Sequence, residues 1–154
     1  MKKMVLTLLM VLVVGVGVSW AEEVLPTEIN QLKAMALNGG IRAQYHLGTI
    51  YSLGYGVEKD MEQAIYWYTK AAENGRAEAQ HFLGATYFFE DDFKNNKAAY
   101  MWVLLAVARS DNDAEKEMRF DMLQTIETEM TREEITEAQA MAAEWQRNFE
   151  AGGE

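Results

Sequence analysis

The chain has 154 residues, of which 49% are hydrophobic, so we expect one domain with a substantial core. Acidic side chains outnumber basic ones 24 to 14, and a surface this negative repels phosphate backbones, which disfavours nucleic acid as a partner. Cysteine is absent, which excludes disulfides, thiolate zinc sites and a cysteine nucleophile.

Residues 1–21 have the three-part layout of a secretory signal peptide. Lys2 and Lys3 precede a run of apolar residues, and Ser19 and Ala21 supply the small residues of a cleavage site. The sequence therefore predicts export, with the mature chain in the periplasm. Anchoring in the inner membrane by an uncleaved segment and secretion to the medium stay open as alternatives, and contact with a membrane is expected only if the segment is not cleaved.

The middle of the chain is a repeat array. Several residue types recur 36 positions later in the first half of a unit and 35 positions later in the second half. The recurring pairs are Ala43-Gln44 and Ala79-Gln80, Leu47-Gly48 and Leu83-Gly84, Tyr51 and Tyr87, Ala64 and Ala99, Trp67 and Trp102, and Ala71 and Ala106. We infer a partial repeat over 28–40 and two repeats over 41–76 and 77–110.

Each unit has the pattern of two helices joined by a turn. Apolar residues follow helical spacing, while Gly54-Tyr55-Gly56 separates the two helices and Asn74-Gly75 ends the second. Gly48 and Gly84 lie inside predicted helices, where glycine costs about 1 kcal/mol, so their recurrence predicts close helix packing.

These motifs resemble the Sel-one-like repeat, a relative of the tetratricopeptide repeat. The resemblance covers roughly residues 28–147 and is carried by Ala43-Gln44, Leu47-Gly48, the turn glycines, Trp67-Tyr68 and Lys70-Ala71-Ala72. In the second unit Glu90 and Asp92 replace both turn glycines, so the resemblance does not extend to the shape of that turn. The resemblance implies an α-solenoid and an adaptor role in protein assemblies.

Residues 113–149 are predicted to form two helices that cap the array. Asp113 is interpreted as an N-cap, and Thr131-x-x-Glu134 as a capping box. Met118, Met122, Leu123, Ile126 and Met130 form the apolar stripe of the first of these helices. The fold class is therefore all-α, with a single solenoid domain over 22–150 and a disordered tail over 151–154.

The sequence offers no clear catalytic, cofactor or metal site. His46 and His81 lack a metal-binding pattern, and Glu90-Asp91-Asp92 is read as a solvated loop tip rather than a cation site. We therefore predict a protein that is not an enzyme. A cell-wall hydrolase that uses these three carboxylates is the alternative.

The predicted function is protein binding by an envelope scaffold. In arrays of this type the first helix of each unit lines the concave side, where aromatic and aliphatic side chains anchor a partner. Equivalent positions of the two units then predict a partner-binding surface of His46, Thr49, Ile50, Leu53, Phe82, Ala85, Thr86 and Phe89.

Overall fold

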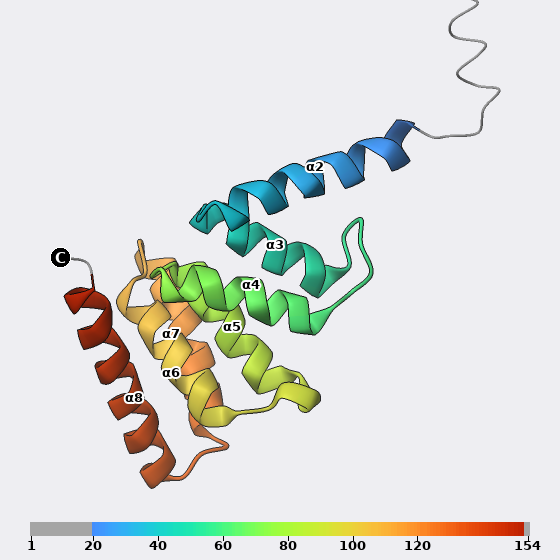
Figure 1. Ribbon diagram of the computed structural model, residues 1–154. Helices are drawn as coiled ribbons and strands as arrows, with labels where there is room; N and C mark the ends of the chain where they lie inside the picture. The colour runs from blue at the N-terminus through green and yellow to red at the C-terminus, as the bar shows by residue number, and fades with distance from the viewer. Residues whose placement is uncertain (1–19, 153–154) are drawn as a thin grey trace, which may run out of the picture.

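The computed structural model describes residues 20–152, and every regular element in this range is helical. The elements are α2 (Trp20–Leu37), α3 (Ile41–Leu53), α4 (Met61–Glu73), α5 (Ala77–Phe89), the 3-10 helix η1 (Asp91–Phe93), α6 (Asn96–Ala108), α7 (Asp113–Glu127) and α8 (Arg132–Ala151). From α2 to α7 each helix packs against the next one in the chain, and α8 returns to lie along α6 (Figure 1). The predicted all-α solenoid is confirmed.

The predicted signal peptide lies outside the described residues, except for its last two positions at the start of α2. Among residues 20–152, none of the helices has the length and apolar character that a bilayer crossing requires.

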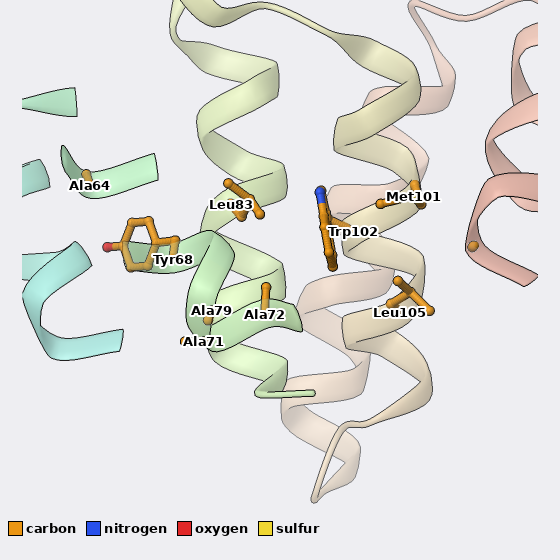
Figure 2. Close-up of a cluster of buried hydrophobic side chains, with 10 residues drawn as sticks. Ala64, Tyr68, Ala71, Ala72, Ala79, Leu83, Met101, Trp102 and Leu105 are labelled. Atoms are coloured by element: carbon orange, nitrogen blue, oxygen red, sulfur yellow. The ribbon is translucent and has the colours of Figure 1, made fainter. Parts of the chain in front are cut away.

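The core runs along the array as three clusters of buried side chains. The first joins α2, α3 and α4 around Leu47 and Trp67, and the second joins α4, α5, α6 and α8 around Leu83 and Trp102. Figure 2 shows Trp102 between α5 and α6, and Tyr68 pointing from α4 toward α3. A third cluster packs α7 and α8 onto α6, so a single hairpin never buries its apolar face alone.

The recurring helix glycines are positions of close approach between helices. A β-carbon at Gly84 would lie 2.6 Å from Val103 Cγ2 and 2.9 Å from the Ala99 carbonyl oxygen, and one at Gly48 would overlap the Tyr68 ring. Tyr68 and Val103 occupy equivalent repeat positions, so both units use the same contact. The close packing predicted from these glycines is confirmed.

A second recurring residue links each first helix to the unit before it. Gln44 Nε2 donates to the Ala36 carbonyl at 3.1 Å, and Gln80 Nε2 donates to the Ala72 carbonyl at 3.1 Å. In the cap, Arg119 Nη1 donates to the Ala106 carbonyl at 3.3 Å. All three side chains are buried, and each gives a second donor to a carbonyl in the last turn of a helix, which also accepts a backbone N–H from the turn that follows.

The two turns inside the repeats close alike but take different paths. Gly54 and Gly56 have φ of 69° and 70°, in the left-handed region that glycine tolerates. The second turn lacks glycine, is one residue shorter and forms η1 instead. Both turns still end on an equivalent backbone bond, from Asp60 N–H to the Tyr51 carbonyl at 3.0 Å and from Asn95 N–H to the Tyr87 carbonyl at 2.8 Å.

The cap corrects two predictions and confirms a third. The N-cap of α7 is Asn112, whose side chain accepts from the Glu115 N–H, and Asp113 is the first helical residue. Met118 is 51% exposed, because Arg119 rather than Met118 turns toward α6. The capping box of Thr131 and Glu134 is present with both of its hydrogen bonds.

Candidate partner-binding groove

The two first helices of the repeats enclose a shallow groove at their C-terminal ends. It has a volume of about 340 Å³, and α3, α4, α5 and the turns beside them contribute its walls. We call it the α3/α5 groove, defined by Ser52, Leu53, Lys59, Met61, Tyr68, Phe82, Ala85, Thr86, Phe89 and Glu90.

Large apolar side chains form the walls of the groove, and small ones lie between them. Leu53 on α3 is 73% exposed and Phe89 on α5 is 66% exposed. Phe82 stands two helical turns before Phe89, so both project from the same side of α5. Ala85 and Thr86 lie between them in the sequence and leave room above the helix backbone.

Five of the eight residues predicted from the sequence line this groove: Leu53, Phe82, Ala85, Thr86 and Phe89. Thr49 lies behind it, where its hydroxyl accepts a hydrogen bond from the Tyr68 phenol at 3.3 Å. Ile50 packs against the core cluster of α2, α3 and α4 instead. His46 is exposed one turn before Ile50, with its ring 5.3 Å from that of Tyr45.

Sequence reasoning missed the residue at the base of the groove. Tyr68 of α4 is buried, its ring stacks on Phe82 with centroids 5.8 Å apart, and its hydroxyl lies 3.3 Å from Ser52 Oγ. Burial raises the pKa of the Tyr68 phenol, and the hydrogen bonds to Ser52 and Thr49 oppose that rise. Tyr68 therefore stays neutral and fixes the distance between α3 and α5. From the sequence, the helical spacing of Tyr68 predicted only that its side chain packs in the core.

An ion pair spans one end of the groove. Lys59 Nζ, in the turn after α3, lies 3.8 Å from Glu90 Oε1, at the end of α5. Both side chains are about half exposed, so this pair contributes at most about 1 kcal/mol to stability. Its main effect is to place one positive charge among the acidic residues of the two turns.

Among the described residues, the titratable side chains near the groove lie in separate environments. Glu90 is engaged by Lys59, while Asp91 and Asp92 are exposed on η1. Burial, with a smaller contribution from the charge of Arg119, lowers the pKa of His81, which favours its neutral form. No three acidic or imidazole side chains of the described residues gather closely enough to hold a metal ion.

The C-terminal cap leaves the groove uncovered. α8 packs on α6, where Trp145 meets Trp102 with ring centroids 5.7 Å apart. The Arg109 guanidinium lies over the Trp145 and Phe149 rings and holds the end of α8 in place. The groove is lined by none of the described residues of α7 or α8.

Stacked helical hairpins, with a groove between the first helices of two repeats, define a helical-repeat architecture. A family model described as Sel1 repeat matches residues 41–75 and 77–111. The chain therefore contains two Sel1 repeats, and repeats of this family are in general modules for protein–protein interaction.

The chain is similar to several solved structures, among them two helical-repeat proteins. One is a protective antigen present in uropathogenic Escherichia coli strains that displays an SLR fold, with 25% identity and a TM-score of 0.71, covering 79% of this chain and 25% of that one. The other is a Sel1 repeat protein from Oxalobacter formigenes, with 26% identity and a TM-score of 0.56, covering 85% of this chain and 53% of that one. The chain thus spans about a quarter and about half of their lengths.

Proposed function

We propose that this protein is a non-enzymatic scaffold of the bacterial cell envelope that binds a protein or peptide partner in the α3/α5 groove. The observation that carries the proposal is the exposure of Leu53 and Phe89 on facing walls of one groove. Exposed apolar side chains that line a shared hollow are typical of interaction sites, whereas scattered ones are not.

The groove can contribute useful binding energy. Complete burial of a Leu or Phe side chain contributes about 1.5–3 kcal/mol, so burial of the exposed parts of Leu53, Phe82 and Phe89 would supply several kcal/mol. Association costs at least as much in lost motion, so the net affinity also depends on the apolar surface that the partner itself buries in the groove. Binding through this surface is therefore expected to be weak and reversible.

Site-specific crosslinking in intact cells tests the groove. A photoreactive phenylalanine analogue is placed at Phe89 and, as the control, at Phe120 of α7, which is 49% exposed outside the groove. We expect an adduct with one defined protein from position 89, abolished by Leu53→Ser, and none from position 120. Equal adducts at both positions, or none at position 89, would contradict a binding role for the groove.

The envelope location is tested separately by the mass and fractionation of the expressed protein. We expect a mature N-terminus at Glu22 and recovery with the periplasmic contents. Recovery with the membrane, with residues 1–21 retained, would favour the anchored adaptor instead.

A further inference from the structure

The turn end of the α3/α5 groove is surrounded by carboxylates. A second hollow of about 620 Å³ adjoins the groove, because Lys59 and Met61 line both. Its walls carry Glu58, Asp60 and Glu62, together with Phe93 of η1. Glu90 lines the groove itself, and Asp91 and Asp92 follow it in η1, next in sequence to Phe93. We call these six carboxylates the acidic rim.

The charge of the rim is mostly uncompensated within the described residues. Lys59 is the one base that lines either hollow, and it is engaged by Glu90. Lys94, which follows η1, is bound by Glu129 Oε2 at 2.9 Å. Asp60 uses one oxygen to cap α4 through the Gln63 N–H, and the other four carboxylates form no ion pair with a described residue.

The spacing of the apolar side chains in the groove matches that of the apolar face of a bound helix. Phe82 and Phe89 are seven residues apart on α5, so their β-carbons are separated along the helix by about 10 Å. Leu53 rises on the facing wall, and the small Ala85 lies between the two phenylalanines in sequence. A partner helix engages such a ridge with apolar residues at i, i+3 or i+4, and i+7.

We propose that the occupant of the α3/α5 groove is a cationic amphipathic helix of a partner protein. Its apolar face packs on Leu53, Phe82 and Phe89, and its Lys or Arg side chains meet the acidic rim. This inference rests on the proposed function and specifies the chemistry of the partner. The rim carboxylates are too exposed to bind strongly one at a time, but four added pairs together strengthen binding by about ten-fold.

The test measures binding of three labelled peptides to the full chain by fluorescence anisotropy. The peptides share one helical apolar face of Leu and Phe, and their polar face is all Lys, all Gln or all Glu. We expect the Lys peptide to bind about ten-fold more tightly than the Gln peptide, the Glu peptide to bind most weakly, and the advantage of Lys to shrink as salt is raised.

Two matched variants assign the charge effect to the rim. In the rim variant, Glu58→Gln, Glu62→Gln, Asp91→Asn and Asp92→Asn should reduce binding of the Lys peptide to the level of the Gln peptide. In the control, Glu117→Gln, Asp121→Asn, Glu133→Gln and Glu144→Gln remove the same charge from exposed positions of the cap. An equal loss in both variants would show an effect of net charge alone and would overturn the proposal.

The outcomes separate the charge inference from the groove itself. If the Lys and Gln peptides bind equally and both lose affinity in Phe89→Ser, the groove binds helices and the cationic preference is wrong. If no peptide binds, or if Phe89→Ser changes nothing, the proposed function fails together with this inference.

Discussion

Arg119 holds the cap to the last repeat, and its removal should be costly. The side chain is 2% exposed. Nη1 donates to Ser110 Oγ at 2.9 Å and to the Ala106 carbonyl at 3.3 Å, and Nη2 lies 3.0 Å from Glu115 Oε2. Arg119→Ala removes the hydrogen bonds that link α7 to Ala106 and Ser110 at the end of α6, together with the ion pair to Glu115 within α7.

The size of the loss follows from these contacts. The two methylenes that Arg119→Ala removes, Cγ and Cδ, together contribute about 2 kcal/mol through their burial, at about 0.8 kcal/mol each. The hydrogen bonds contribute about 1–2 kcal/mol net, because the Ala106 carbonyl keeps the Ser110 hydroxyl as a second donor and Arg119 Nε is buried without a partner. We therefore expect Arg119→Ala to lower the free energy of unfolding by about 3–4 kcal/mol. Arg119→Met keeps most of the packing and should cost about 1–2 kcal/mol.

Urea unfolding followed by tryptophan fluorescence measures these differences, since Trp102 and Trp145 lie in the core next to the cap. Arg132→Ala is the control, because Arg132 is exposed at the start of α8, and it should leave stability within about 0.5 kcal/mol. A loss below about 1 kcal/mol for Arg119→Ala would refute the assignment of Arg119 as a link between α6 and α7.

Three further predictions concern stability. Gly84→Ala should lower the free energy of unfolding by about 1 kcal/mol net and so lower the melting temperature. The better helix propensity of alanine is outweighed because the backbone carbonyl of Ala99 cannot move away from the new β-carbon. An unchanged or higher melting temperature in calorimetry would contradict this. Thr131→Ala removes the N-cap of α8 and should cost about 1 kcal/mol in urea unfolding, whereas Thr136→Ala, an exposed position within the same helix, should cost less. Burial lowers the pKa of His81 in the fold, so the unfolded chain takes up the proton first and stability should fall as the pH drops below the ordinary value of 6.5. The fall should be smaller in His81→Gln than in His46→Gln, as seen from melting temperatures between pH 7.5 and 5.5.

The repeat period was readable from the sequence because the recurring residues are the ones whose packing tolerates least change. Gly48 and Gly84 recur because another helix leaves no space for a β-carbon, and Gln44 and Gln80 recur because each satisfies the same kind of buried carbonyl. Helix bounds followed from these residues and from the turn glycines. The fold was therefore predictable without knowledge of any contact.

The features that the sequence did not predict are places where a different residue type makes an equivalent contact or turn. Arg119 makes in the cap the hydrogen bond that Gln44 and Gln80 make in the repeats. Because the residue type differs, a search for recurring residues could not find this contact, and Met118 was predicted to be buried instead. In the turn, η1 replaces two glycines and still ends on the equivalent backbone bond. Ile50 was predicted in the groove because it lies one turn before Leu53 on the same side of α3, but it packs against the cluster that holds α2, while Leu53 lies at the end of the helix and lines the groove.

α3 belongs to two parts of the molecule at once. Leu47 is buried in the cluster that holds α2, while Leu53, less than two turns later, forms a wall of the groove. α2 packs mainly on α3, so its protection from hydrogen exchange depends on how firmly α3 is held. Occupation of the groove should therefore slow amide exchange in α2 as well as in α3, although α2 would not contact the ligand.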